Sequence, residues 1–210
     1  NLIELRYIRI HRTSEGAIFD NCTFQNHKGD SAIVGNSIIP SNHMFINCTF
    51  QNNTFNKDGF GAAGISILYG LDIIVIENCL FRDSVGRLIG GAISINSANL
   101  LYIDNSSFIN NRVEIEEGYI DHPGLGGGIY IKHTLGSTSK INNCYFENNE
   151  AYSSSGGIHI ESNMKEFLED FIIDNCTFFN CTSKIGGAIT NGEPSSSTDF
   201  FGNLVRSVNI

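Results

Sequence analysis

The sequence has few of the residues that nucleic-acid binding and membrane insertion require. Lysine and arginine together number 13 against 22 aspartates and glutamates, which gives a formal net charge of -9. Binding to phosphates depends on neutralisation by Lys and Arg, so this balance argues against nucleic acid and anionic membranes as partners. The longest apolar runs, such as 73–76, are about four or five residues long, against the ~20 that a membrane-spanning helix needs. We therefore expect no nucleic-acid partner and no membrane insertion by this segment.

Tryptophan is absent, proline occurs three times, and most of the chain has no helical periodicity. Instead, short apolar triplets alternate with Asn-rich or Gly-rich segments, a pattern typical of short β-strands. The 210 residues are 41% apolar, which is enough to bury one continuous core. The sequence therefore predicts an all-β protein with no room for a second domain.

Two short phrases alternate along the chain. The first has an apolar residue, a residue that is usually small or acidic, Asn, Cys (once Ser), any residue, and Phe. It occurs at 19–24, 45–50, 76–81, 103–108, 141–146 and 173–178. The second has small residues followed by Ile, and it occurs at 31–33, 63–67, 91–95, 127–131, 156–160 and 187–190. A repeat of about 30 residues is the signature of a solenoid of stacked coils.

Alternation within the phrases predicts which side chains face the core. In 93–95 and its equivalents, the flanking Ile face inward and the residue between them faces outward. In the first phrase, the apolar residue, Cys and Phe all face inward only if the chain bends at Asn, which tolerates left-handed backbone. Parallel crossovers are right-handed in nearly all cases. We therefore predict a right-handed parallel β-helix of about six coils with three short strands per coil, in one domain over 1–210 with repeats over about 17–191.

Five of the six cysteines fall at one position of the first phrase, where Ser106 stands in the remaining copy. That substitution favours buried free thiols that fill the core. Bridges between neighbouring coils, such as Cys22 to Cys48 or Cys144 to Cys176, are the alternative that the sequence leaves open. No CxxC pair occurs, so a structural zinc site is not expected.

Six N-x-S/T sequons occur, at Asn21, Asn47, Asn52, Asn105, Asn175 and Asn180. Four of these residues are the bend Asn of the first phrase, and we expect them to stack as a buried hydrogen-bonded ladder that cannot carry a glycan. Asn52 and Asn180 begin the variable loop instead. They are the candidate glycosylation sites.

The second phrase predicts a flat and uncharged outer face. Its small residues and outward positions include Ala92, Ser94, Tyr130, His159 and Ala188. Another backbone or a flat ligand can approach such a surface closely. We expect this face to contact a protein partner or a neighbouring copy of the chain, and we expect Ala92→Arg or Ala188→Arg to abolish that association.

Insertions between the phrases are longest on one side of the coils, and loops on solenoids often carry recognition. The segment 112–125, with Glu116, Tyr119 and His122, is therefore the first candidate for specific contact, and 164–169 is the second. Within the first segment, the eight residues 114–121 include four carboxylates. We interpret them as a solvated acidic loop in preference to a calcium site, because their spacing matches no known calcium loop.

Neighbouring outward carboxylates would indicate a β-helix that cleaves polysaccharides. Such hydrolysis needs two carboxyl groups about 5 to 9.5 Å apart. The outward positions of the second phrase carry none, and the acids before the bend form one adjacent pair, at Glu77 and Asp104. The histidines share no repeat position and no metal-ligand spacing. We expect no catalysis, no cofactor and no metal, with a polysaccharide lyase or hydrolase as the rival interpretation.

Two tetrapeptides connect the chain with a known family. GGAI stands at 90–93 and 186–189, and FxxN stands at 50–53, 108–111 and 146–149. Alternating GGAI and FxxN repeats resemble the polymorphic outer membrane protein family of microbial surface proteins. The resemblance implies an extracellular or cell-surface β-helical passenger that acts in adhesion or in building an extracellular structure, with no catalytic residues to carry over. It leaves a protein partner, self-association and glycans as the partners to consider.

Both ends of the chain are strand-like runs, at 2–10 and 200–205, without polar caps. Solenoids need such caps for solubility, so we expect a segment of a longer or processed protein. Open strand edges also recruit further strands. A subunit of an extracellular filament, stacked end to end, is therefore the alternative function.

Overall fold

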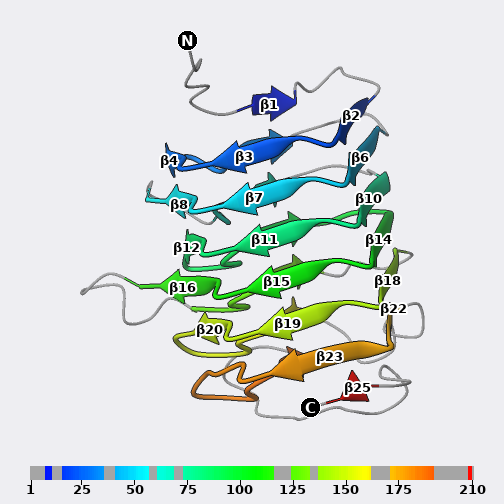
Figure 1. Ribbon diagram of the computed structural model, residues 1–210. Helices are drawn as coiled ribbons and strands as arrows, with labels where there is room; N and C mark the ends of the chain where they lie inside the picture. The colour runs from blue at the N-terminus through cyan, green and yellow to red at the C-terminus, as the bar shows by residue number, and fades with distance from the viewer. Residues whose placement is uncertain are drawn as a thin grey trace.

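Short strands stacked rung upon rung make up the molecule (Figure 1). The computed structural model describes residues 8–10, 16–35, 41–56, 61–68, 73–115, 124–132, 137–161, 171–191 and 208–209. Within these ranges every regular element is a β-strand. None of the described residues belongs to a helix with the length and apolar character that crossing a membrane requires.

The strands form four parallel sheets, which we name A to D. Sheet A contains β1 (Ile8–Ile10), β5 (Ile33–Gly35), β9 (Ile65–Ile67), β13 (Ile93–Asn96), β17 (Ile129–Lys132), β21 (Ile158–Glu161) and β24 (Ile189–Asn191). Sheet B contains β2 (Gly16–Asp20), β6 (Asn42–Ile46), β10 (Ile73–Glu77), β14 (Leu100–Asp104), β18 (Thr138–Asn142) and β22 (Phe171–Asp174). Sheet C contains β3 (Thr23–Gln25), β7 (Thr49–Gln51), β11 (Leu80–Arg82), β15 (Ser107–Ile109), β19 (Tyr145–Glu147), β23 (Cys176–Phe179) and β25 (Val208–Asn209). Sheet D contains β4 (Lys28–Gly29), β8 (Thr54–Phe55), β12 (Val85–Arg87), β16 (Arg112–Glu114) and β20 (Glu150–Ala151).

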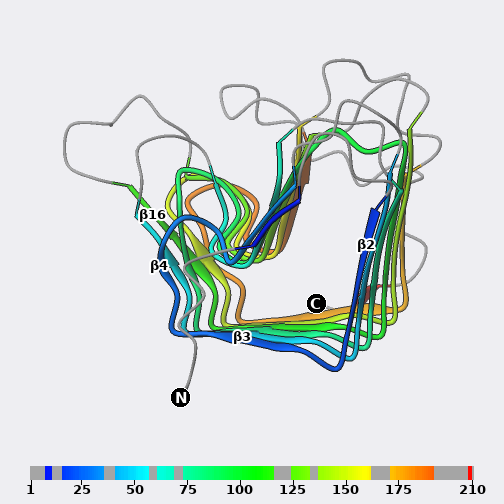
Figure 2. The same cartoon turned by 90° about the horizontal axis from the view of Figure 1, so that it is seen from above.

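Each coil passes through sheets A, B, C and D in turn, and Figure 2 shows this path end-on. Sheets B and C meet at one corner, sheets C and D meet at the next, and the chain then curls back to sheet A. The predicted parallel β-helix is confirmed, but each coil that includes sheet D has a fourth strand besides the three predicted. The strands of sheet D have two or three residues, which is too few for an alternating pattern to be visible in the sequence.

Left-handed Asn residues form the corner between sheets B and C. Their φ angles lie between 47° and 54°. They are Asn21, Asn47, Asn78, Asn105, Asn143 and Asn175. The bend predicted at this Asn is thus confirmed. The predicted burial is wrong, because all of these side chains are exposed; a residue at a convex corner points away from the coil.

A second left-handed column forms the corner between sheets C and D. Its φ angles lie between 51° and 59°. It consists of Asn26, Asn52, Asp83, Asn110, Asn148 and Asn180. The candidate glycosylation sites Asn52 and Asn180 are exposed here, and the four other sequon asparagines are exposed at the first corner. Burial therefore gives no reason to separate these two sequons from the rest, and glycosylation stays a prediction.

The buried asparagine ladder lies one residue beyond the second corner, at the last position of FxxN. Asn53, Asn111 and Asn149 are each 0% exposed. Asn149 Nδ2 donates to the Phe108 carbonyl oxygen at 2.8 Å, and its Oδ1 accepts the Asn111 N–H at 3.0 Å. Each such side chain bonds to the preceding coil, so the amides tie the rungs together. A buried amide destabilises the fold unless it is hydrogen-bonded. The fold therefore requires these asparagines to keep their hydrogen bonds.

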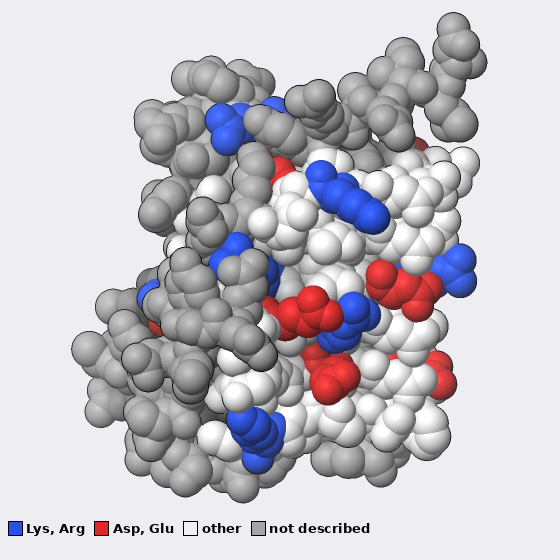
Figure 3. Space-filling model, turned by 90° about the vertical axis from the view of Figure 1, so that its left-hand side faces the viewer, with Lys and Arg blue, Asp and Glu red and all other residues white. Residues whose placement is uncertain are grey.

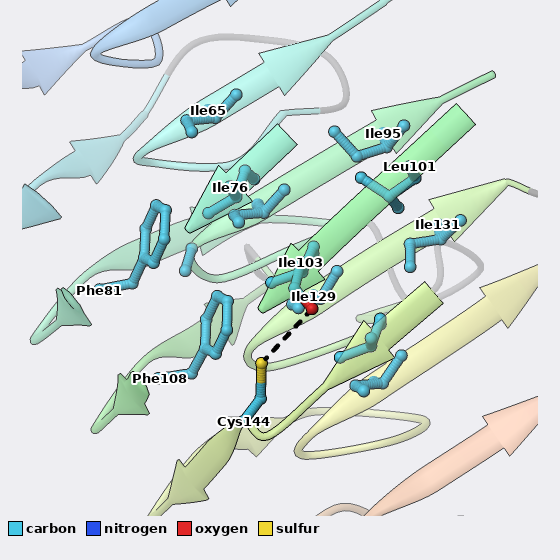
Figure 4. Packing of buried hydrophobic residues seen from close by; sticks show 14 of the residues in the cluster. Ile65, Ile76, Phe81, Ile95, Leu101, Ile103, Phe108, Ile129, Ile131 and Cys144 are labelled. Carbon is cyan, nitrogen blue, oxygen red and sulfur yellow. Dashed lines mark hydrogen bonds between the residues drawn. The ribbon is translucent and has the colours of Figure 1, made fainter. Parts of the chain in front are cut away.

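Columns of identical apolar side chains fill the space between sheets A, B and C (Figure 4). Phe rings from successive strands of sheet C stack face to face, with centroids 4.7 Å apart for Phe50 and Phe81 and 5.0 Å apart for Phe81 and Phe108. Ile side chains from sheets A and B belong to the same core, among them Ile95 and Ile103. The predicted inward positions of Phe and Ile are confirmed. Burial of each large apolar side chain contributes about 1.5–3 kcal/mol to folding.

Five of the six cysteines line the same core at the start of sheet C, and Cys181 lies beyond the second corner. All are free in the structure, and Cys48, Cys79, Cys144 and Cys176 are buried. Their thiols donate to backbone carbonyl oxygens, as Cys144 Sγ does to Ile103 at 3.9 Å (Figure 4). Burial is the main reason why the pKa of Cys79 rises to about 12. The buried thiols fill space in the core that contains the Phe and Ile columns.

Candidate interaction surface

The face predicted to be open, on the outer side of sheet A, is covered by the chain itself. Ser94 and Tyr130 are 2% and 5% exposed and His159 is 0% exposed, whereas Ala92, also 0% exposed, belongs to the hydrophobic core. The segments that curl from sheet D back to sheet A lie over this face (Figure 2). The predicted partner contact at these four residues is therefore wrong.

Hydrogen bonds and close packing fix this cover. Ser31 Oγ donates to Ser66 Oγ at 2.7 Å, and the Ala62 N–H donates to the same Ser66 oxygen at 2.9 Å. A Cβ added at Gly91 would lie 1.9 Å from the Gly127 carbonyl oxygen. The small residues of the second phrase thus permit close approach between parts of the same chain. Sequence alternation reports which way a side chain points, and it does not reveal where a returning segment lies.

Of the remaining residues predicted to contact a partner, one is half-buried and the others lie outside the described residues. Ala188 is half-buried. Glu116, Tyr119 and His122 lie outside the described residues, as does 164–169, so the loop predictions stay predictions. Of the first loop, Arg112 is exposed and its Nε lies 2.7 Å from a Glu114 carboxylate oxygen.

His159 is the centre of a buried polar cluster beneath the cover. Its Nδ1 lies 2.9 Å from Thr190 Oγ1, and its ring is stacked on Tyr130 with centroids 5.8 Å apart. Burial lowers the pKa of His159 to about 4. Nearby, the Tyr130 hydroxyl donates to Glu161, whose carboxylate also pairs with Lys132 at 2.7 Å. The pair of Lys132 and Glu161 at the edge of the cluster is partly exposed, whereas the His159 ring is fully buried.

Three of the exposed large apolar residues in the described part of the chain lie on the outer face of sheet B. Register places Ile18, Met44, Val75 and Tyr102 in one column across four neighbouring strands. Ile46, Ile73 and Leu100 flank that column on the same strands. Ile18 is 69% exposed, Ile73 is 37% and Leu100 is 36%. We call these seven residues, on β2, β6, β10 and β14, the apolar face.

A sequence signal for this face exists in strands that are apolar at consecutive positions. A strand with one buried side should alternate apolar and polar residues, whereas 73–76 and 100–103 are apolar throughout. The burial pattern of β10 nevertheless alternates, with Ile74 and Ile76 buried. The extra apolar residues, Ile73 and Val75, therefore belong to the outer side.

Carboxylates border the apolar face on the side of the first corner. Asp20, Glu77 and Asp104 occupy one register column, with Ile46 between the first two. Asp104 is 8% exposed and accepts hydrogen bonds from the side-chain amides of Asn142 and Asn143, both at 3.0 Å. The adjacent acidic pair at Glu77 and Asp104 thus contains one buried carboxylate that is held by amides. Among the described residues, no group of three or more His, Cys, Asp or Glu side chains could hold a metal ion.

The outer face of sheet C is mixed, because Phe179 on β23 is 57% exposed while polar side chains of other strands bond to one another. On sheet C, Gln51 Nε2 donates to Gln25 Oε1 at 2.6 Å, and Arg82 Nη2 donates to Gln51 Oε1 at 2.7 Å. Figure 3 views the side that carries sheet D, where positive and negative residues are interspersed. The outer side of sheet B differs from these faces in that its apolar residues form a continuous column across four neighbouring strands.

Comparison with known proteins supplies the family. A family model described as a right-handed β-helix region matches residues 7–205. The chain is a right-handed β-helix protein. No curated protein and no solved structure matches it. Membership of the right-handed β-helix family agrees with the predicted fold, and it leaves the activity open because the same fold serves many functions.

Proposed function

We propose that this right-handed β-helix is a non-catalytic structural or adhesive module, extracellular or at the cell surface, that attaches or assembles through its apolar face. The observation that carries the proposal is the exposure of Ile18, Ile73 and Leu100 on one side of sheet B. Contiguous exposed apolar surface on a soluble domain typically marks an interaction site. The GGAI and FxxN repeats, which resemble those of polymorphic outer membrane proteins, support the surface location.

The β-helix provides a rigid base for such a face. Every strand of sheet B pairs in register with the next, and the inner side of the sheet is held by buried Ile76 and Ile103. Apolar side chains on the outer side are therefore fixed in rows before any partner arrives. A surface that is ordered in advance loses little conformational entropy on binding.

Adsorption to surfaces of defined chemistry tests this function. We expect the protein to adsorb more strongly to an alkyl-terminated than to a hydroxyl-terminated monolayer. Val75→Lys should lower the amount bound to the alkyl surface about threefold or more, because it reduces the apolar area that binding buries. Leu80→Lys is the matched control, because it adds the same charge on the outer side of sheet C in the same coil. A quartz crystal microbalance measures the bound mass.

Equal loss from Val75→Lys and Leu80→Lys would show that the apolar face does not direct attachment. The non-catalytic part of the proposal has its own check. Incubation of the protein with pectin, alginate and glycosaminoglycans should release no reducing or unsaturated ends above background, and release would favour the polysaccharide-cleaving alternative.

A filament that grows end to end is the second candidate function, and the first coil favours it. Among the described strands, β2 and β3 are the outermost strands of sheets B and C. Phe19 and Phe24 stack on Phe45 and Phe50 at 5.2 and 4.7 Å, yet both remain half-buried. Edge strands of this kind recruit further strands. Negative-stain electron microscopy of the protein should then show filaments that Gln25→Pro shortens, because proline cannot donate to an added strand; particles that stay monomeric at high concentration contradict this candidate.

A further inference from the structure

We propose that the partner of the apolar face is an amphipathic α-helix whose apolar stripe is bordered on one side by Lys or Arg. The inference rests on the proposed function and names the occupant of the same surface. Three features carry it: the strand pairing on both sides of β6, β10 and β14, the spacing of the apolar column, and the carboxylates along one edge.

The backbone of this surface is already hydrogen-bonded. Strand β10 pairs with β6 on one side and with β14 on the other, so its N–H and C=O groups are used within the sheet. A partner on this face therefore contacts side chains and cannot extend the sheet. This excludes strand addition at the apolar face and leaves contact between side chains as the mode of binding.

The spacing of the column fits a helix that lies across the strands. Ile18, Met44, Val75 and Tyr102 follow one another at each rung, ~4.8 Å apart. Apolar positions i, i+3, i+4 and i+7 of a helix recur every ~5 Å along its axis, whereas alternate residues of a strand recur every ~6.6 Å. The four rungs span about 14 Å, which about ten helical residues cover. A helix thus places one apolar side chain on each rung, and a crossing strand does not.

Charge selects the basic border of the helix. Asp20 lies two residues along the strand from Ile18, and Glu77 lies two residues from Val75, so both carboxylates flank the column on the same side. In a helix that lies along the column, the side chains on the flank nearest the carboxylates lie over the carboxylate row. Lysine or arginine there forms ion pairs with the row, and acidic residues are repelled. The column ends at Lys140, which follows Tyr102 in register.

A second copy of the chain fits less well. Each copy carries a formal net charge of -9. Two apolar faces brought together by a twofold axis along the strands would also oppose their carboxylate rows. Repulsion of this kind disfavours the symmetric contact, and a basic partner gains from the same charges.

Binding of two designed peptides to the whole chain tests the inference. Both peptides are amphipathic helices of about 14 residues with the same Leu stripe; one carries Lys on its polar positions and the other carries Glu. Fluorescence anisotropy measures the dissociation constant of each. We expect the Leu/Lys helix to bind at least about tenfold more tightly than the Leu/Glu helix.

Matched variants separate the apolar face from general attraction to an acidic protein. Val75→Lys should raise the dissociation constant of the Leu/Lys helix about tenfold. Leu80→Lys changes the net charge equally, on sheet C, and should change this constant less than about twofold. Glu77→Gln should weaken binding about threefold at low salt, and Glu147→Gln on sheet C should not. Circular dichroism confirms that each variant keeps its β-structure.

Equal binding of the two peptides, or equal effects of Val75→Lys and Leu80→Lys, overturns the inference. Sedimentation that reveals a dimer abolished by Val75→Lys also overturns it, because the occupant is then a second copy. If adsorption to alkyl surfaces depends on Val75 while no helix binds, the partner is wrong and the adhesive function stands. If neither depends on Val75, both fail.

Discussion

His159 lies where an imidazolium ion is costly. The ring is 0% exposed, it is stacked on Tyr130, and its Nδ1 is paired with the Thr190 hydroxyl. Burial lowers its pKa from 6.5 to about 4, and the Glu161 carboxylate opposes this effect to a smaller extent. Folding therefore requires the neutral ring, whereas the unfolded chain takes up a proton near the ordinary pKa of histidine.

The stability of the folded protein should consequently fall in acid. The contribution of His159 is fully present above pH 6.5 and is lost as the pH falls from 6.5 towards 4, by an amount on the order of 3 kcal/mol. Urea unfolding at pH 7.5, 6, 5 and 4 measures this slope. His159→Asn, which keeps a polar group near Nδ1 but does not titrate, should flatten the curve in that range; an unchanged slope would show that other groups cause it.

Single residues also mark the limit of what the sequence predicts. The bend at Asn47 and its equivalents followed from parity, since Cys and Phe cannot face the core without it. Parity could not tell an exposed corner from a buried ladder. The buried amides at Asn53, Asn111 and Asn149 had a visible signal in the FxxN repeat, because a polar residue at a fixed position of a stacked coil must find a fixed partner.

At the scale of elements, the sheets differ in how directly their patterns can be interpreted. The strands of sheet A alternate regularly, yet their outer side is buried beneath segments that return from sheet D. Sheet B has consecutive apolar residues, and its outer side is exposed. Alternation gives the direction of each side chain relative to the core. Exposure depends also on the path of the connections, which no local pattern determines.

Substitution at the second phrase should therefore affect folding before it affects any partner. Ala92 belongs to the hydrophobic core and is 0% exposed, so Ala92→Arg buries a charge without a partner and should destabilise the fold by about 4 kcal/mol. Ala188 is half-buried, and Ala188→Arg should cost about 1 kcal/mol. Urea unfolding at neutral pH compares them. Equal stability of Ala92→Arg and the unmodified protein would contradict the core position of Ala92.

At the scale of the whole molecule, each coil contacts its immediate neighbours through four parallel sheets. Stability in such a solenoid is approximately a sum of the coils and the interfaces between them. This explains why the fold could be predicted from repetition, since every coil packs equivalent side chains in the same way. It also explains why the apolar face could not be predicted in the same way, because this face arises from positions that vary between repeats.

The buried amides have a consequence for how the chain is made. Asn149 bonds to Phe108 and Asn111, which precede it by a full coil, and Asn53 and Asn111 bond in the same way to Phe24 and Phe81. A coil that leaves the ribosome therefore finds these acceptors and donors in chain that is already synthesised. Folding can follow synthesis from the N-terminus, each turn serving as the template for the next.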